Sequence, residues 1–278
     1  MITQEKIAQR VRGIVQSSAL MPPIELILEN GIGHEANTDV HDLFHRYGRG
    51  LVAGMVSDGM IKPNSRILDV GCGLGRLARI LTSFLSPRGS YHGMDVCKSS
   101  IDWCVENYRN HPNFKFDHAD VFSTHYNPAS VTSAASYSFP FNAHEFDCIF
   151  STSLFTHLIA KDAEHYIEEM ARVLKPGGKT WNTFLLLDDI STPLASTFDP
   201  KHAATHLPII VDRGRIALRS DPEALTALNT SFVKEVHRRS GLEILEVRNG
   251  PWSGRTDNIR SSYQDVVITR KPRFWQFR

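Results

Sequence analysis

The residues that point most directly to chemistry are three glycines, Gly71, Gly73 and Gly75. They separate an apolar run, 66–70, from a stretch with helical spacing of apolar residues, 76–85. Glycines at such a strand-to-helix turn let the backbone turn tightly and let a ligand approach the main chain. The segment therefore predicts a site for a nucleotide-containing cofactor.

The residue at position 76 distinguishes between two classes of cofactor. The nicotinamide fingerprint is Gly-x-Gly-x-x-Gly, and its third glycine permits close packing of helix on strand. Here the spacing is Gly-x-Gly-x-Gly, and Arg76 occupies the place of that third glycine. The bulky arginine argues against a nicotinamide cofactor. A turn without any ligand is the alternative if the glycines are considered alone.

Two aspartates lie at the ends of the next two predicted strands. Asp95 is placed to accept hydrogen bonds from ribose hydroxyls, and the alternative is a helix N-cap. Asp120 has apolar neighbours, between which a purine ring could lie while the carboxylate accepts from its amino group. The alternative for Asp120 is a loop cap.

An alternation of strands and helices must position these residues, and it predicts a helix-covered α/β sheet with parallel pairing. The predicted strands are 66–70, 91–96, 114–118, 146–151 and 179–187, with Pro176-Gly177-Gly178 as a sharp stop before the last of them. The predicted helices are 76–85, 100–108, 163–174 and 221–240. Two final strands, 242–247 and 263–270, have no helix between them and would be antiparallel neighbours at the sheet edge.

Three regions do not follow the alternation. Residues 1–60 carry mixed helical spacing and predict two or three short helices. Residues 123–145 are rich in Ser, Ala and Asn, and residues 188–222 carry Asp, His, Pro and scattered apolar residues. Long insertions at strand ends of α/β proteins are either disordered or functional lids, and we expect 188–222 to be a lid.

The composition of the chain argues against several classes of function. The chain has 278 residues with 31 basic and 30 acidic side chains, so its formal charge of +1 provides no overall attraction to nucleic acid or anionic membrane. It has no run of eighteen apolar residues and no apolar segment typical of a signal peptide. Its four cysteines form no Cys-x-x-Cys pair, which argues against a disulfide scaffold or structural zinc and favours a cytoplasmic location.

Four segments in order resemble the class I S-adenosylmethionine-dependent methyltransferases over roughly residues 62–187. They are ILDVGCGLG, YHGMDV, FKFDHADVF, and FDCIFSTSLFTHL followed by MARVLKPGGK. The resemblance implies a Rossmann-like fold, with a seven-stranded, mostly parallel sheet, an antiparallel last strand and helices on both faces. It divides the chain into an N-terminal helical cap, 1–60, and a methyltransferase domain, 61–278, with the insertions 123–145 and 188–222.

The resemblance also implies roles for individual residues. Asp69 would lie near the methionine part of S-adenosylmethionine, the glycines would border the methionine and ribose, and Asp95 would hold the ribose hydroxyls. Asp120, with Val121 behind it, would face adenine, and Ser151 would supply a backbone contact. The implied cofactor-binding residues are Asp69, Gly71, Cys72, Gly73, Gly75, Asp95, Val96, Asp120, Val121 and Ser151.

Methyl transfer from a sulfonium is an in-line displacement, so the protein mainly aligns the acceptor and excludes water. A hydroxyl acceptor also needs a base. We expect His157 in this role, since imidazole titrates near neutral pH, with Asp188 (beside Asp189) as the rival. The alternatives are loop ordering for His157 and helix capping for Asp188. We expect no metal, because His202 and His206 have helical spacing but no third ligand.

The predicted function is therefore O-methylation of a hydroxyl on a small molecule or a sugar or glycan, with S-adenosylhomocysteine as product. The motifs SLFTHL and GPWSGR resemble a subgroup associated with glycan or natural-product modification. Trp252, Arg255, His125 and Tyr126 are candidates to line the acceptor pocket, with surface loop or edge packing as the alternative. N-methylation of a small molecule and a non-catalytic cofactor-binding protein remain open. The loop after the fourth strand lacks the Asn/Asp-Pro-Pro pattern of base-acting enzymes, so we expect no nucleic-acid partner.

Overall fold

The computed structural model describes residues 20–31, 39–197, 205–257 and 262–273. The chain forms two compact units, residues 1–119 and 120–278. Its main sheet has seven strands in the order β10-β11-β5-β4-β1-β2-β3. The pairs β1–β2, β2–β3 and β4–β5 are parallel, whereas β11 is antiparallel to both β5 and β10. The predicted mostly parallel sheet with an antiparallel last strand is confirmed.

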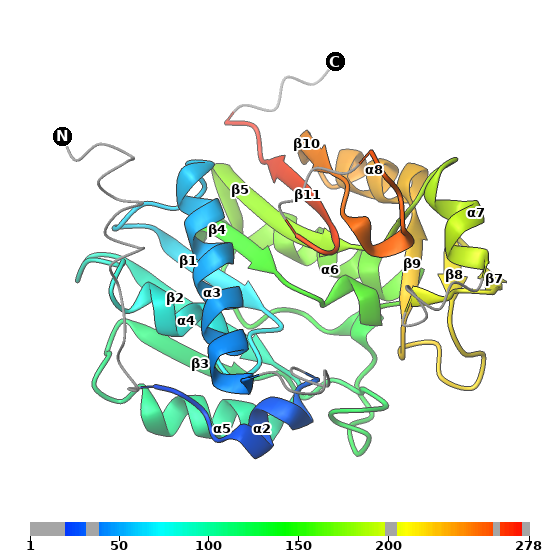
Figure 1. The fold of residues 1–278 in the computed structure, drawn as a ribbon. Helices are drawn as coiled ribbons and strands as arrows, with labels where there is room; N and C mark the ends of the chain where they lie inside the picture. Colours follow the sequence, from blue (N-terminus) through cyan, green and yellow to red (C-terminus); the bar gives the residue numbers. More distant parts are fainter. Residues whose placement is uncertain (1–19, 32–38, 198–204, 258–261, 274–278) are drawn as a thin grey trace. The chain divides into compact units, whose positions relative to one another are not determined.

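The first unit contains three strands and four helices among its described residues. They are α2 (Ile24–Glu29), α3 (Val40–Ser57), β1 (Arg66–Val70), α4 (Arg76–Leu81), β2 (Ser90–Asp95), α5 (Lys98–Asn107) and β3 (Phe114–His118). The long helix α3 packs against α4 and α2 (Figure 1). Residues 1–60 thus include one long helix of 18 residues as well as a short one, where only short helices were predicted.

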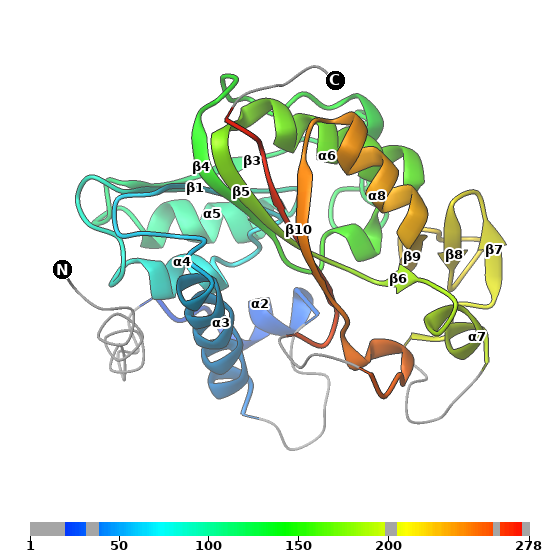
Figure 2. The same ribbon diagram turned by 90° about the horizontal axis from the view of Figure 1, so that it is seen from above.

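The second unit carries the other four strands of the main sheet and two longer helices. Its elements in this part are η1 (Ala134–Ser136), β4 (Phe146–Ser151), η2 (Phe155–His157), α6 (Ala160–Val173), β5 (Leu174–Phe184), α8 (Thr230–Arg239), β10 (Glu243–Arg248), η4 (Pro251–Ser253) and β11 (Asp265–Arg270). Helices α6 and α8 lie side by side (Figures 1 and 2). The predicted antiparallel pair of final strands is confirmed, with β10 at the edge.

A second, four-stranded sheet is a feature that the sequence did not predict. It runs in the order β6-β9-β8-β7 and comprises β6 (Leu186–Leu187), β9 (Thr226–Asn229), β8 (Gly214–Ile216) and β7 (Ile209–Val211). The short helix α7 (Ser191–Ser196) packs against β6. The predicted helix over 221–240 is therefore wrong in its first half, because residues 226–229 extend this sheet and the helix begins only at Thr230.

The predicted stop at Pro176-Gly177-Gly178 is also wrong in detail. Strand β5 begins at Leu174, and the Pro-Gly-Gly sequence lies inside it at a register shift against β4. Gly177 has φ of +83°, and its N–H donates to Lys271 O beyond the end of β11. The glycine thus makes a kink within the strand rather than a boundary.

His237 on α8 predicts a distinctive pH dependence of stability. Its ring is fully buried, Nδ1 donates to Val233 O at 2.7 Å, and Nε2 has no hydrogen-bond partner among the described residues. Burial lowers the pKa of His237 to about 4 from 6.5. Between these values the unfolded chain binds a proton that the folded chain does not, so stability falls as pH decreases. The full loss is about 3 kcal/mol.

The measurement is urea unfolding of the wild type and His237→Gln between pH 7.5 and 4.5. The glutamine variant should lack this part of the acid destabilisation, so the difference in unfolding free energy between the two proteins should change by up to about 3 kcal/mol over this interval. Buried Asp69 and Asp265 have raised pKa values and act in the opposite direction, but both are present in both proteins. A difference that is constant with pH would contradict the prediction.

Candidate functional site

The glycine turn after β1 adopts a conformation that requires glycine. Gly71, Gly73 and Gly75 have φ values of +80°, +49° and +70°. A Cβ atom on Gly75 would lie 3.2 Å from the Tyr108 hydroxyl and 3.3 Å from Cys104 Sγ. The turn is thus held in a left-handed backbone against α5, as expected for a loop that presents its main chain to a ligand.

Asp95, at the end of β2, fixes this turn. Its Oδ2 accepts from Gly73 N at 2.7 Å and its Oδ1 accepts from Cys97 N at 2.8 Å. Burial raises the pKa of Asp95, and the backbone hydrogen bonds from Cys97 and Gly73 oppose that rise. Each carboxylate oxygen has two lone pairs, so the same carboxylate has capacity for further donors such as ribose hydroxyls. The alternative role as a helix N-cap is wrong, because Cys97 is the N-cap residue of α5 and no side chain caps that helix.

Asp69 is the most deeply buried acid of the turn, at 1% exposure. Its Oδ2 accepts from the Tyr91 hydroxyl at 2.6 Å, while its Oδ1 has no hydrogen-bond partner among the described residues. A buried oxygen without a donor costs free energy unless a ligand or a proton satisfies it. This orphaned oxygen and the left-handed glycines fit a cofactor that carries a cationic donor.

The N-terminal helices contact the same turn. Asn30, at the C-terminal end of α2, lies with its Oδ1 3.4 Å from the position of a Cβ on Gly73, and this oxygen accepts from Ser100 at 3.1 Å. Ile27 and Phe44 pack on Leu74 of the turn in a buried apolar cluster. Sequence reasoning missed Asn30 and Tyr91, because their relation to the turn depends on packing between segments far apart along the chain.

Two more of the predicted cofactor residues, Cys72 and Val96, belong to this unit. Cys72 is buried, and its N–H donates to Met94 O at 3.2 Å. Val96 accepts at its carbonyl from His118 at 3.1 Å. The structure therefore gathers Asp69, Gly71, Cys72, Gly73, Gly75, Asp95 and Val96 at the ends of β1 and β2.

The remaining predicted cofactor residues lie in the unit 120–278. Asp120 is exposed, and its Oδ1 accepts from Asn127 at 3.1 Å. Val121 is 1% exposed, and its carbonyl also accepts from Asn127. Ser151 at the end of β4 is fully buried, and its hydroxyl donates to Asn182 at 3.0 Å. The Ser151 side chain is thus engaged within the sheet, which is compatible with a contact through its backbone only.

The loop after β4 contains a strained residue. Ser153 has φ of +59°, a left-handed conformation that is uncommon outside glycine. Its N–H donates to Thr183 at 2.7 Å, and its hydroxyl accepts from Gln264 at 3.1 Å. Such strain is concentrated at functional sites, and it marks this loop as a candidate.

His157 at the end of η2 has a defined orientation. Its Nδ1 lies 2.8 Å from the Glu223 carbonyl oxygen. Because a carbonyl oxygen only accepts, Nδ1 carries the proton, and in the neutral ring Nε2 holds the lone pair. The ring is half-buried. The geometry suits a general base.

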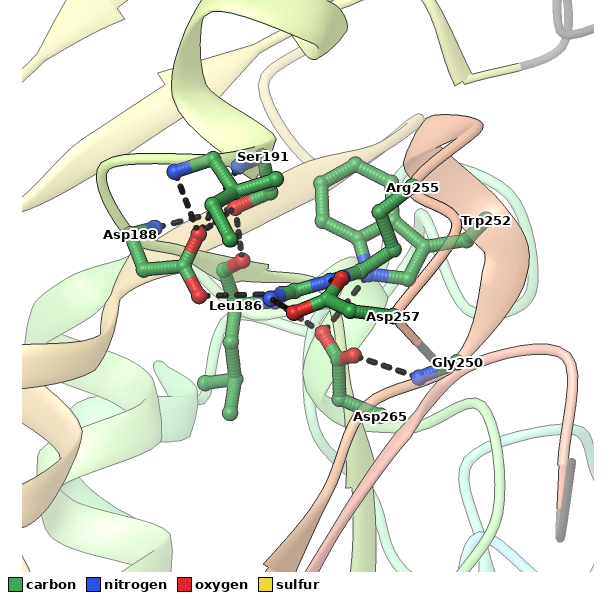
Figure 3. A network of polar contacts seen from close by, with 9 residues as sticks. Leu186, Asp188, Ser191, Gly250, Trp252, Arg255, Asp257 and Asp265 are labelled. Atoms are coloured by element: carbon green, nitrogen blue, oxygen red, sulfur yellow. Dashed lines mark hydrogen bonds and ion pairs between the residues drawn. The ribbon is translucent and has the colours of Figure 1, made fainter. Parts of the chain in front are cut away.

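Asp188, the rival base, is engaged by several donors. It accepts from the Ser191 hydroxyl and N–H, from Ile190 N, and from Arg255 at 2.9 Å (Figure 3). These hydrogen bonds outweigh the effect of partial burial and lower the pKa of Asp188. A carboxylate with a lowered pKa is a weak base, so the geometry favours His157 of the two.

Trp252 and Arg255 are interior residues rather than exposed pocket walls. Trp252 is fully buried and donates through Nε1 to Asp265 Oδ2 at 2.6 Å, and Asp265 also accepts from Leu186 N and Gly250 N (Figure 3). The Arg255 side chain is 2% exposed and pairs with both Asp188 and Asp257. The network joins η4 to β6 and β11, and neither residue lines an open surface.

His125 and Tyr126, by contrast, are exposed. His125 pairs with Asp221 at 2.8 Å, which links the first predicted insertion to the second. His202 lies outside the described residues. No helix in the described parts of the chain is long and apolar enough to cross a membrane.

Comparison with known proteins gives a family match in the same region. Residues 68–181 match the family model described as "Methyltransferase domain". A glycine/sarcosine/dimethylglycine N-methyltransferase from Actinopolyspora halophila is 28% identical over 206 residues, which cover 70% of this chain and 32% of that protein. The first curated relatives are matched over only 32% to 62% of their own length.

Solved structures show the same fold at low identity. A putative sarcosine dimethylglycine methyltransferase from Galdieria sulphuraria has a TM-score of 0.55 at 14% identity, with 97% of this chain and 98% of that chain covered. The [4+2]-cyclase SpnF also has a TM-score of 0.55, at 16% identity, with 97% of both chains covered. Since a cyclase is among the neighbours, the fold by itself does not specify the reaction.

Proposed function

We propose that the chain, whose residues 68–181 match a methyltransferase domain, is a class I S-adenosylmethionine-dependent methyltransferase that transfers the methyl group of S-adenosylmethionine to a hydroxyl of a small molecule, sugar or glycan. The observation that carries the cofactor assignment is the Asp95 carboxylate, which accepts from Gly73 N in a turn built from left-handed glycines. The free cysteines are in keeping with a cytoplasmic location, which is part of the proposal.

S-adenosylmethionine supplies an electrophilic methyl group on a sulfonium. In the proposed site, Asp95 accepts from ribose hydroxyls, the turn 71–75 presents its backbone, and Asp69 lies at the methionine end. Asp120 and Val121 take the adenine, and the Ser151 backbone contributes a further contact. Such groups act by positioning, which removes the entropic cost of aligning the reactants.

The proposed base is His157. Its Nδ1–H bond to the Glu223 carbonyl holds the ring in the tautomer whose Nε2 accepts a proton from the acceptor hydroxyl. Asp188 is assigned a supporting role in this proposal, since it holds Arg255 and the start of α7.

A second candidate, N-methylation of a small amine, is favoured by the names of two relatives, both of which describe glycine or sarcosine methylation. A neutral amine attacks through its own lone pair and does not need a base at the moment of transfer. The two candidates therefore differ in how much they depend on His157.

The first experiment is a calorimetric titration with S-adenosylhomocysteine, with NAD run beside it. We expect binding of S-adenosylhomocysteine and no binding of NAD. Hydroxyl-bearing sugars and phenols and small amines would then be screened as acceptors for radiolabelled methyl. Binding of NAD alone would overturn the cofactor assignment, and methylation of amines only would favour the second candidate.

Replacing Asp95 tests the cofactor assignment directly. We expect Asp95→Ala to weaken S-adenosylhomocysteine binding by about 1–3 kcal/mol, roughly 5- to 150-fold, since it removes charge-assisted acceptors and releases the Gly73 and Cys97 N–H groups. The matched control is Asp102→Ala, an exposed acid on α5 that pairs with Lys98. Calorimetry measures both variants, and equal affinities would contradict the assignment.

A further inference from the structure

Tyr91 and Asp69 form a buried pair directly beneath the glycine turn. The Tyr91 hydroxyl donates to Asp69 Oδ2 at 2.6 Å, and each residue is 1% exposed. Tyr91 stacks on Phe114 at 5.3 Å between ring centroids and contacts Phe116 at 5.6 Å, so its ring has little freedom to move. The pair thus fixes one oxygen of the carboxylate and leaves Oδ1 without a partner among the described residues.

The surroundings of the pair determine the charge of Asp69. Burial raises the pKa of Asp69 to about 7, the Tyr91 hydrogen bond and the Arg76 charge lower it, and Asp95 raises it. Cys72 and Cys104 also face this group, and burial raises the pKa of both thiols, so they are neutral near pH 7. With a pKa of about 7, Asp69 exchanges its proton near neutral pH.

A cationic donor near Oδ1 would shift the equilibrium between the protonated and the ionised form of Asp69. An ionised carboxylate accepts at both oxygens, whereas a protonated one presents a hydroxyl at the orphaned position. An adjacent positive charge favours the ionised form of a carboxyl group. The methionine part of S-adenosylmethionine carries an ammonium, which has this charge and the required N–H donors.

We propose that Tyr91 is a positioning residue that fixes the carboxyl group of Asp69, and that binding of the cofactor to this carboxyl group releases one proton from Asp69. The inference rests on the proposed function. On binding, the Asp69 O–H bond breaks, the proton passes to solvent, and the cofactor's ammonium is paired by the resulting carboxylate. By linkage, affinity rises with pH as Asp69 ionises in the free protein and levels off above that range.

The first test is calorimetry of the full chain with S-adenosylhomocysteine between pH 5.5 and 8.5, in buffers of different ionisation enthalpy. The buffer dependence of the heat gives the number of protons released. We expect release of most of one proton near pH 6 and little at pH 8.5, and binding about tenfold weaker at pH 6 than on the plateau. The ligand's own amino group titrates in every sample, so Asp69→Asn provides the reference from which the Asp69 contribution is obtained.

Tyr91→Phe tests the positioning role. Loss of the phenol removes a hydrogen bond that favours the ionised carboxylate, so the pH midpoint of binding should move upward, while Asp69→Asn should abolish the Asp69 step. The matched control is Tyr108→Phe, which removes a buried hydroxyl from the same aromatic cluster. That hydroxyl donates to Gly75 O and not to a carboxylate, so the midpoint should stay in place.

The outcomes separate the inference from the function on which it rests. Binding that releases no proton, or a midpoint that is the same in Tyr91→Phe and the wild type, would overturn the inference and leave the cofactor assignment intact. Absence of binding at every pH would overturn the proposed function and the inference together. If Tyr91→Phe does not fold, the difference in proton release between the wild type and Asp69→Asn decides whether Asp69 is the linked group.

Discussion

His157→Gln is expected to lower the turnover of a hydroxyl acceptor by roughly 10²- to 10⁴-fold, the range that general-base catalysis contributes. Glutamine is similar in length to histidine, and its amide can still donate to the Glu223 carbonyl, so the loop should keep its position. It has no basic nitrogen. The variant therefore removes the proton acceptor with little change in the packing around η2.

The same variant should keep its affinity for S-adenosylhomocysteine, which separates a base from a residue that orders the cofactor site. The control is His165→Gln, a histidine of the same unit that also bonds a backbone carbonyl, that of Tyr137 at 2.9 Å. Initial rates of methyl transfer and calorimetry on both variants make the comparison. Full turnover in His157→Gln with an acceptor hydroxyl would place the base elsewhere, and full turnover with an amine only would support N-methylation.

The main sheet was predictable because its strands are short apolar runs that end at strong turn residues. The segments 66–70, 114–118 and 146–151 were each predicted with the bounds observed. The positions of the strands in the chain also indicated where the site lies, since the chemistry-bearing residues lie at the ends of strands or directly after them. Asp69, Asp95 and the glycines could thus be located without any knowledge of packing.

The second sheet was not predictable in the same way. Strands β7 and β8 have three residues each, and no periodicity is visible over so short a length. Residues 226–229 form a strand that runs directly into α8, so the apolar residues of the strand look like an extension of the helix pattern. Only pairing with β6 and β8 shows that they are extended.

The burial of polar residues could not be predicted from the sequence either. Arg255 and Trp252 have the composition of a sugar-binding surface, yet the structure places them in an interior network with Asp188 and Asp265. Asp188 and Arg255 are 67 positions apart, and no spacing rule connects them. Their roles follow from tertiary contacts, which a single sequence does not display.

Trp252→Ala is expected to reduce the free energy of unfolding by about 3–5 kcal/mol, the range for a large aromatic residue removed from a core. Trp252 is fully buried and packs in the apolar cluster of the second sheet, with Leu185, Leu187, Ala195, Leu207 and Ala227. The substitution creates a cavity there. It also leaves Asp265 without the Nε1–H donor that it holds at 2.6 Å.

Two companion variants divide this effect into its parts. Trp252→Phe keeps most of the apolar volume but loses the Nε1–H donor, so it should cost less than the alanine variant, about 1–3 kcal/mol. Trp103→Ala removes a tryptophan that is only partly buried and lies in the other unit, and it should have the smallest effect of the three. Urea unfolding followed by circular dichroism measures all three. If Trp252→Ala were no less stable than Trp103→Ala, the network around Asp265 would not be what holds η4 to β6 and β11.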